Sequence, residues 1–215
     1  LLSMLGELCS NERIMEFQQN ELLVEFADSI LMLTLNRPEQ RNALTFEMYQ
    51  KISEFCQRAG TELDDQGIKA IVISGAGEKA FAAGTDIGQF TSFKTLQDGH
   101  DYEAQIESVI SSIETCRVPV IAALHGAVTG GGLVIAAAAH LRLASADVKI
   151  GMPIARTLGN CLAITNLRRL VALFGEARVA HMILTAELLS ADQALASGFV
   201  HDVLEDRAAM LARAN

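Results

Sequence analysis

The sequence has no apolar run long enough to cross a membrane. A membrane-spanning helix needs roughly 20 consecutive, mostly apolar residues, whereas the most apolar segment, 133–139, is short and is followed by His140 and Arg142. The first eight residues are largely apolar but lack a basic start and include Glu7, which argues against a secretory signal. We therefore expect a cytoplasmic protein that does not interact with the membrane.

The sequence also lacks an excess of positive charge and lacks paired cysteines. Its 17 Lys and Arg residues are outnumbered by 26 Asp and Glu residues, which gives a formal net charge of −9. General binders of nucleic acid depend on clustered Lys and Arg, so no nucleic-acid partner is expected. The four cysteines, Cys9, Cys56, Cys116 and Cys161, are scattered without a CxxC motif. This predicts reduced thiols and no metal site.

What is present is the composition of a folded globular protein. Half of the 215 residues are hydrophobic and a fifth are charged, and the length suffices for one large domain with a core. Residues 1–20 show no clear alternation and are expected to form an N-terminal lead-in. No internal repeat or low-complexity linker divides the rest, so residues 21–215 are expected to form a single domain.

Apolar patterns along this domain predict an α/β protein, in which strands and helices alternate. The expected strands are 22–26, 30–35, 68–74, 118–124, 141–144 and 148–150. The expected helices run from Thr45 to near Gly60, over 101–116 and over 131–139, and a helical region with breaks at Gly175, near Ser190 and at Gly198 follows from 162 onward.

Two glycine-bearing bends each follow an apolar strand. One is Gly130-Gly131-Gly132, which opens an alanine-rich helix, and the other is Ala83-Gly84-Thr85-Asp86. The first turn of a helix has N–H groups with no partner inside the helix, and its dipole attracts negative charge. Two convergent N–H groups can stabilise a carbonyl oxygen that becomes negative during a reaction. Glycines at a helix start can equally serve only to allow close packing.

Four sets of residues, in a fixed order, extend this pattern from Leu22 to Val203. They are Asn36-Arg37-Pro38 with Arg41-Asn42-Ala43-Leu44, then Phe81-Ala82-Ala83-Gly84-Thr85-Asp86-Ile87, then His125-Gly126 with Gly130-Gly131-Gly132, and finally Ala194-Leu195-Ala196-Ser197-Gly198-Phe199-Val200. By these residues the chain resembles the enoyl-CoA hydratase/isomerase family, the crotonases. The resemblance implies a crotonase-like spiral of repeated strand-strand-helix units. It also implies an oxyanion hole, in which the backbone N–H groups of Thr85 and Gly131 bind the thioester carbonyl of an acyl-CoA.

The resemblance further implies a CoA-binding loop over residues 36–44. Arg37 and Arg41 are the candidates for the CoA phosphates, and the backbone near Ala43 would line the pantetheine. The other residues expected at the substrate are Ala83, Asp86 and Ile87. CoA would be part of the substrate, and no separate cofactor is expected. Taken alone, the same loop is an ordinary strand-to-helix connection, and relatives often carry a Lys after the Asp-Ile pair where Gly88 stands here.

Asp86 admits two interpretations. It could act as an acid or base beside the carbonyl, or it could fix the loop by accepting hydrogen bonds. We favour the second, because the resemblance places it facing away from the reacting carbons.

Both carboxylates that hydratases of this family use as base and acid are missing. Their positions by resemblance are Val134 and Ile154, and neither side chain can exchange a proton. Three explanations remain open. A different carboxylate, Glu103 or Glu107, reaches the site; or the polar group Arg156, Thr157 and Asn160 serves another reaction; or the protein binds acyl-CoA without efficient turnover.

Two other classes of enzyme fit poorly. Residues 75–80 match a GxGxxA dinucleotide pattern but are not followed by helical spacing, and no GxSxG hydrolase motif occurs. We expect an acyl-CoA enzyme of fatty acid metabolism, a lyase or isomerase of the enoyl-CoA hydratase/isomerase type. The alternative is a non-catalytic acyl-CoA-binding or assembly protein on the same fold. By resemblance we also expect homotrimers or hexamers, with the C-terminal oligomerisation helices absent or incomplete in a chain ending at Asn215.

Overall fold

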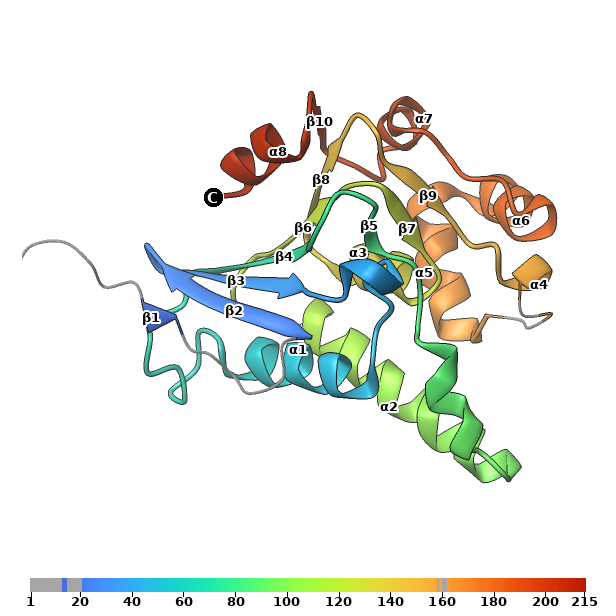
Figure 1. The fold of residues 1–215 in the computed structure, drawn as a ribbon, viewed down its shortest axis with the longest axis horizontal. Coiled ribbons are helices and arrows are strands. Elements are labelled where there is room, and N and C mark those ends of the chain that lie inside the picture. The colour runs from blue at the N-terminus through green and yellow to red at the C-terminus, as the bar shows by residue number, and fades with distance from the viewer. Residues whose placement is uncertain (1–12, 15–20, 158, 160–161) are drawn as a thin grey trace, which may run out of the picture.

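The computed structural model describes residues 13–14, 21–157, 159 and 162–215, and its strands form two sheets (Figure 1). The larger sheet has the order β1-β2-β3-β4-β6-β8-β10. Its strands are β1 (Arg13–Ile14), β2 (Leu22–Ala27), β3 (Ile30–Leu35), β4 (Ala70–Gly75), β6 (Val120–Leu124), β8 (Leu141–Ser145) and β10 (Asp202–Leu204). The smaller sheet consists of β5 (Ala80–Ala82), β7 (Ala127–Thr129) and β9 (Lys149–Gly151).

The chain alternates between these sheets, which produces the expected spiral. Each of the pairs β4-β5, β6-β7 and β8-β9 places its first strand in the larger sheet and its second in the smaller one. Helix α2 (Leu96–Glu114) follows the first pair and α3 (Gly131–Ala138) follows the second. The strands from β3 to β10 pair in parallel, whereas β1, β2 and β3 pair antiparallel. The α/β class and the strand-strand-helix repeat predicted from the sequence are confirmed.

Burial follows the strand patterns. In β3 the side chains of Leu31, Leu33 and Leu35 are buried and those between them are partly exposed, as the period of two requires. In β4 every residue from Ile71 to Gly75 is buried, which identifies a strand covered on both faces.

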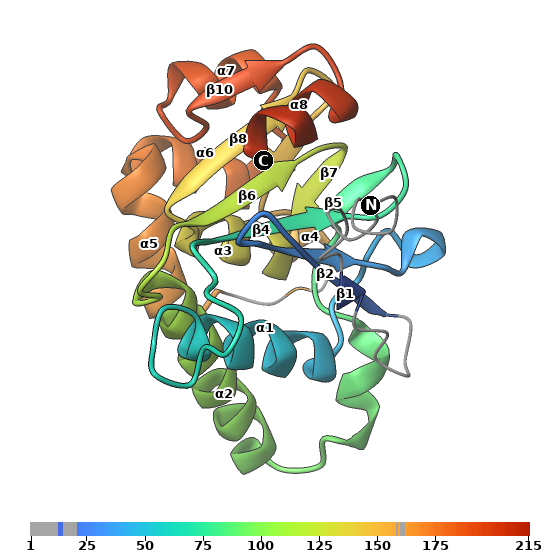
Figure 2. The same ribbon diagram turned by 90° about the vertical axis from the view of Figure 1, so that its left-hand side faces the viewer.

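Helices cover the larger sheet on both sides. Helices α1 (Phe46–Arg58) and α2 lie together on one side, and α8 (Arg207–Ala214) lies on the other (Figures 1 and 2). A second, small core forms beneath α8, where Met210 packs against Val72 and Leu143. The remaining helices gather beside the smaller sheet. They are α4 (Ile154–Thr157), α5 (Ile164–Phe174), α6 (Glu176–Thr185) and α7 (Ala191–Ala196).

The structure differs from the sequence-based expectation at three places. Helix α2 begins at Leu96, five residues early, because Thr95 and Asp98 form a reciprocal capping box. The strands β5, β7 and β10 were not expected, since each is only three residues long. Within the lead-in, Arg13 and Ile14 pair with β2, and the other residues of 1–20 lie outside the described part of the chain. None of the helices in the described residues is long and apolar enough to cross a membrane.

Candidate active site

The two glycine-bearing bends meet at the ends of β5 and β7. These strands pair in parallel, Ala80 with Ala127 and Ala82 with Val128. The residues that follow are therefore carried to the same edge of the smaller sheet. A β-carbon added at Gly130 would lie 3.2 Å from the Cα of Gly84. The family resemblance implied that the bends converge, and in the structure Gly84 and Gly130 lie close together.

A one-residue bridge fixes the Thr85 backbone. Leu44 N–H donates to the Gly84 carbonyl at 2.8 Å, and Asp86 N–H donates to the Leu44 carbonyl at 2.9 Å. Because Leu44 bonds to the residues on either side of Thr85, the N–H and C=O of Thr85 itself point away from Leu44. No acceptor for the Thr85 N–H occurs among the described residues.

Gly131 begins α3 and has no room for a side chain. Gly130 before it has φ 54°, a left-handed conformation that favours glycine. A β-carbon on Gly131 would overlap the Tyr49 hydroxyl oxygen and would lie 2.9 Å from Thr85 Oγ1. The Gly131 N–H is one of the first-turn groups that α3 cannot satisfy, and the described part of the chain offers it no other acceptor. Two unpaired backbone donors therefore lie on adjoining bends.

Three hydroxyl groups adjoin these donors. Tyr49 of α1 lies 2.9 Å from Thr85 Oγ1, and Tyr102 of α2 lies 3.3 Å from the same oxygen. Burial raises the pKa of both tyrosines, so both are protonated near neutral pH. Sequence reasoning missed this cluster, because Tyr49 falls on the apolar stripe of its helix and is counted as core. The signal available was that the chain has only two tyrosines.

An aromatic cluster lies next to Tyr102. Phe90 belongs to a 3-10 turn, Ile87–Ser92, directly after Asp86, and its ring centroid is 4.9 Å from that of Tyr102. Phe46 and Phe93 complete the cluster, with centroids 5.4 Å and 6.0 Å from Tyr102. The bend that presents Thr85 thus continues into an apolar wall.

Arg37 is held by groups of the protein itself. Its guanidinium lies 3.1 Å from Glu21, lies 2.8 Å from Asp86 and donates to the Ala43 carbonyl at 2.6 Å. Only 12% of its side chain is exposed. A CoA phosphate would have to compete with two carboxylates for this arginine, so its assignment as a phosphate ligand stays a prediction.

Asp86 accepts hydrogen bonds that fix its loop, which is the interpretation favoured from the sequence. Its Oδ2 accepts from Arg37, and its Oδ1 accepts the Gly88 N–H at 2.9 Å. The Arg37 guanidinium and the Gly88 N–H lower the pKa of the Asp86 carboxyl, so it is ionised near neutral pH. An ionised carboxylate with these partners is a poor proton donor.

Asn42 anchors the CoA-binding loop in a way that sequence reasoning missed. Its buried side chain donates to the carbonyls of Ala76 and Ala80 at 2.9 Å and 2.7 Å and accepts the Arg37 N–H at 2.9 Å. The neighbouring Arg41 is exposed, and its carbonyl accepts the Ala83 N–H at 3.0 Å.

The exposed and half-buried residues of this region are available to a ligand. Arg41 is exposed, Ala43 and Ala83 are half-buried, and Ile87 is 62% exposed. Their assignment to the substrate stays a prediction.

The two positions that the resemblance assigns to the missing carboxylates hold apolar side chains that are wholly or partly buried. Val134 is buried in α3 and Ile154 is half-buried at the start of α4. Glu107 cannot readily replace them, because it binds Arg169 at 2.5 Å and 2.8 Å, which lowers the pKa of Glu107. Glu103 is exposed on α2, without such a partner among the described ion pairs.

Of the three polar residues suggested as an alternative, the structure describes only two. Arg156 and Thr157 are exposed on α4, where the Thr157 hydroxyl donates to the Pro153 carbonyl at 3.0 Å. Asn160 lies outside the described residues.

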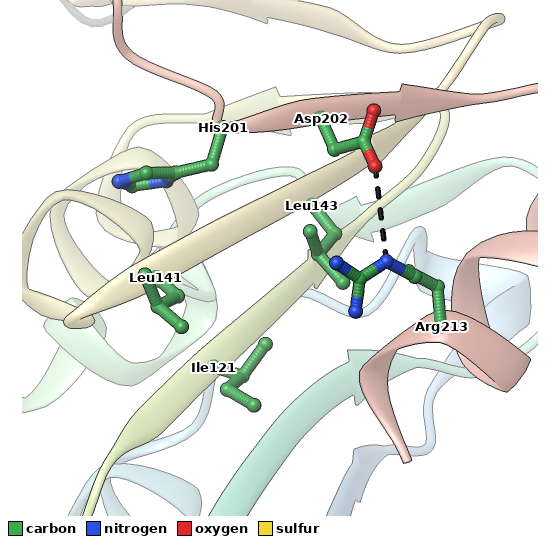
Figure 3. A pocket seen from close by; sticks show the side chains of 6 residues that line it. All are labelled: Ile121, Leu141, Leu143, His201, Asp202 and Arg213. Carbon is green, nitrogen blue, oxygen red and sulfur yellow. Dashed lines mark ion pairs between the residues drawn. The ribbon is translucent and has the colours of Figure 1, made fainter.

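A separate cavity of about 230 Å³ lies on the α8 side of the larger sheet (Figure 3). Its floor is apolar, and Asp202 and Arg213 pair across it at 3.9 Å. Its residues come from β6, β8, β10, α8 and His201 just before β10, not from the two bends. The cavity therefore does not belong to the site described above.

Comparisons with known proteins agree with the fold. The family model described as enoyl-CoA hydratase/isomerase matches residues 25–214. A probable enoyl-CoA hydratase of Bacillus subtilis is 34% identical over 185 residues, which cover 86% of this chain and 69% of the relative. A short-chain-enoyl-CoA hydratase of Clostridium acetobutylicum is 32% identical, with the same coverage of 86% and 69%.

The structural likeness is equally extensive. The crystal structure of an enoyl-CoA hydratase/carnithine racemase from Magnetospirillum magneticum has a TM-score of 0.81 and 30% identity, and the match covers 90% of this chain and 72% of that one. With the family model spanning nearly the whole chain and relatives above 30% identity, this protein belongs to the enoyl-CoA hydratase/isomerase family.

Proposed function

We propose that the protein binds an acyl-CoA thioester with its carbonyl oxygen between the N–H groups of Thr85 and Gly131, which polarise the carbonyl towards an enolate. The observation that carries the proposal is the contact between the two bends, each with a backbone donor that lacks an acceptor among the described residues. The family membership of the chain supplies the substrate class.

The physical basis is electrostatic. Negative charge develops on the thioester oxygen when a proton leaves the α-carbon or when a nucleophile adds to the double bond. Two preset N–H donors stabilise that charge without having to reorganise, and loss of one such donor typically costs about 10²- to 10³-fold in rate. The N-terminal end of α3 adds a favourable dipole at the same place.

Val134 and Ile154 narrow the chemistry within the family. A water-addition step that depends on a carboxylate pair loses about 10²- to 10⁴-fold for each missing acid or base. We therefore favour a reaction in which enolate stabilisation is the larger part of the task and one carboxylate suffices. A proton shift along the acyl chain is such a reaction, and Glu103 is the candidate that would take the proton from one carbon and return it to another. Hydration is expected to be slow.

The CoA portion is proposed to lie along residues 36–44. Arg41 would contact a phosphate, Arg37 would brace the loop, and Ala43, Ala83 and Ile87 would line the pantetheine and the thioester. CoA enters as part of the substrate. We further propose a cytoplasmic homotrimer or hexamer, which light scattering coupled to size-exclusion chromatography would test.

The decisive experiment is an infrared difference spectrum of butyryl-CoA labelled with ¹³C at the thioester carbonyl. On binding, the labelled carbonyl stretch should shift to lower frequency, because two hydrogen bonds weaken the C=O bond. Gly131→Ala should reduce the shift, whereas Ser108→Ala, at an exposed position of α2, should leave it unchanged. Binding without any shift would contradict the proposal.

Turnover is measured in parallel with a panel of enoyl-CoA and dienoyl-CoA thioesters. The proposal predicts a larger rate for double-bond migration than for hydration. Tight binding with a normal carbonyl shift and no turnover of any thioester would favour the non-catalytic alternative.

A further inference from the structure

The two tyrosines of the chain converge on one threonine hydroxyl, although they come from different helices. Tyr49 of α1 lies 2.9 Å and Tyr102 of α2 lies 3.3 Å from Thr85 Oγ1. Thr85 is also the residue whose N–H is proposed to bind the thioester oxygen. The three hydroxyls therefore form a short chain whose middle member is the residue proposed to bind the thioester oxygen.

Counting protons gives this chain a direction. Three hydroxyls carry three protons, but two hydrogen bonds use only two of them, so one of the three hydroxyls retains a free donor. Tyr49 is 1% exposed and Thr85 Oγ1 is its only hydrogen-bond partner within the described residues. A buried donor without a partner is costly, so Tyr49 donates to Thr85. If Thr85 donates in turn to Tyr102, its own proton also has an acceptor, and the half-buried Tyr102 keeps the unused proton.

Burial keeps the chain in this form. It raises the pKa of the Tyr49 and Tyr102 hydroxyls, so neither loses its proton near neutral pH. Tyr102 therefore presents a neutral hydrogen-bond donor and cannot act as a base.

The position of Tyr102 limits what it can reach. Thr85 Oγ1 lies about 3 Å from the nitrogen of its own residue by covalent geometry, and the Tyr102 hydroxyl is one hydrogen bond further. An acyl chain that leaves the thioester on the side of the Thr85 side chain would bring its α- and β-carbons towards this hydroxyl. The rings of Phe46, Phe90 and Phe93 around Tyr102 make the remainder of the wall apolar.

We propose that the Tyr102 hydroxyl is a specificity-determining donor, which favours acyl-CoA thioesters that carry an oxygen on the β-carbon over those with a plain hydrocarbon chain. Tyr49 and Thr85 are positioning residues that turn the Tyr102 proton outward. This inference rests on the proposed function, since it requires the thioester to lie between Thr85 and Gly131. It also provides a polar contact in a site where Val134 and Ile154 provide none.

The test compares two thioesters of equal chain length. Acetoacetyl-CoA has a keto oxygen on the β-carbon and butyryl-CoA does not. Titration calorimetry should show that Tyr102→Phe weakens acetoacetyl-CoA binding about threefold to tenfold, the value of one neutral hydrogen bond. Butyryl-CoA binding should change less than about twofold, because that ligand never used the hydroxyl.

Tyr49→Phe provides a second, independent variant. Without the donor from Tyr49, Thr85 Oγ1 can accept from Tyr102, which turns the Tyr102 proton inward for part of the time. The variant should therefore lose part of the preference for acetoacetyl-CoA, although residue 49 is buried behind Thr85. Ser108→Ala, which removes an exposed hydroxyl from α2, should preserve the preference in full.

The outcomes separate the possibilities. If Tyr102→Phe lost the same affinity for both thioesters, Tyr102 would only support the structure. If it lost affinity for neither, Tyr102 would donate to neither. Either result would overturn this inference. Failure of the unaltered protein to bind either thioester would overturn the proposed function and this inference with it. A preserved preference in Tyr102→Phe alongside a normal carbonyl shift would overturn this inference alone.

Discussion

The hydroxyl oxygen of Tyr49 occupies the space that a β-carbon on residue 131 would need. Glycine at position 131 is therefore a requirement imposed by a side chain on α1, 82 positions earlier in the sequence. The overlap also brings the buried end of the hydroxyl chain against the start of α3, where the proposed second donor lies.

The first prediction concerns this overlap. Gly131→Ala should lower stability by about 1–3 kcal/mol through overpacking and should weaken acyl-CoA binding about tenfold or more by displacing one donor. Gly131→Ala with Tyr49→Phe should recover part of the stability, but only part, because Thr85 Oγ1 would still lie 2.9 Å from the new methyl group. Urea denaturation and calorimetry measure both effects.

A matched control exists in α2. A β-carbon on Gly99 would meet open space, so Gly99→Ala should stabilise the protein by about 0.5–1 kcal/mol. If Gly131→Ala proved as harmless as Gly99→Ala, the close approach of Tyr49 to residue 131 would be refuted.

The second prediction concerns Asn42. Asn42→Ala leaves the half-buried carbonyl of Ala76 and the buried carbonyl of Ala80 without this donor, and should cost about 2–3 kcal/mol of stability in urea denaturation. Gln50→Ala, on the exposed face of α1, should change stability by less than about 0.5 kcal/mol. A similar small effect at both positions would show that Asn42 does not anchor the loop.

The third prediction concerns pH. The folded-state pKa of Asp86 lies below its ordinary value near 3.8, so its ion pair with Arg37 stabilises the fold above about pH 4 and is lost as the pH falls further. Asp86→Asn should flatten the acid limb of the stability curve and cost about 0.5–1 kcal/mol at pH 7, a modest value because 28% of the Asp86 side chain is exposed.

The comparison for Asp86 is Asp65→Asn. Asp65 pairs with Arg58 at 3.5 Å with 79% of its side chain exposed. This variant should leave the acid limb unchanged. An acid limb that is equally steep in Asp86→Asn and in the unaltered protein would contradict the assignment.

The fourth prediction separates the two remaining glutamates. Glu107→Gln should lower stability, because it breaks a paired contact with Arg169, and should have little effect on turnover. Glu103→Gln should do the opposite if Glu103 delivers the proton in the reaction. Rates for one reactive thioester, measured beside thermal unfolding, distinguish the two residues, and equal rate losses in both variants would show that the ion pair does not disable Glu107.

The fifth prediction concerns glutamates introduced at the two positions where the family resemblance expects them. Val134→Glu combined with Ile154→Glu should raise the hydration of crotonyl-CoA by about 10²-fold or more, since each group supplies general acid or base help. Some stability will be lost, because Val134 is buried. No gain in a folded double variant would indicate that these positions do not face the acyl group.

Much of the fold could be predicted from the sequence, because apolar residues recur at the spacing of strands and helices. The strands from Leu22 to Leu124 and the helix from Thr45 follow regular apolar patterns that survive in the structure. The short strands β5, β7 and β10 have too few residues for a pattern, and their pairing depends on partners distant in the chain. The start of α2 depended on one capping pair, Thr95 and Asp98, in a polar stretch.

For the site, only the two backbone bends could be predicted, and the side-chain contacts around them could not. Glycines mark where chain segments approach closely, but it was the resemblance to the crotonases that implied the meeting of the Thr85 and Gly131 bends. The roles of Tyr49 and Asn42 could not be predicted, because their partners are 36 and 34–38 residues away. The ion pairs of Arg37 with Glu21 and Asp86 could not be predicted either, because the charge of an arginine does not show whether it binds a ligand or another residue of the protein.

The bridge between Leu44 and Thr85 has a mechanical consequence. The loop proposed to bind the nucleotide end of CoA and the bend proposed to hold the thioester are joined by two backbone hydrogen bonds, so the position of one constrains the position of the other. Binding energy gained at the CoA phosphates, far from the reacting atoms, can then be used to orient the thioester carbonyl in the site. Short thioesters that lack the nucleotide should for this reason react slowly even when they saturate the protein.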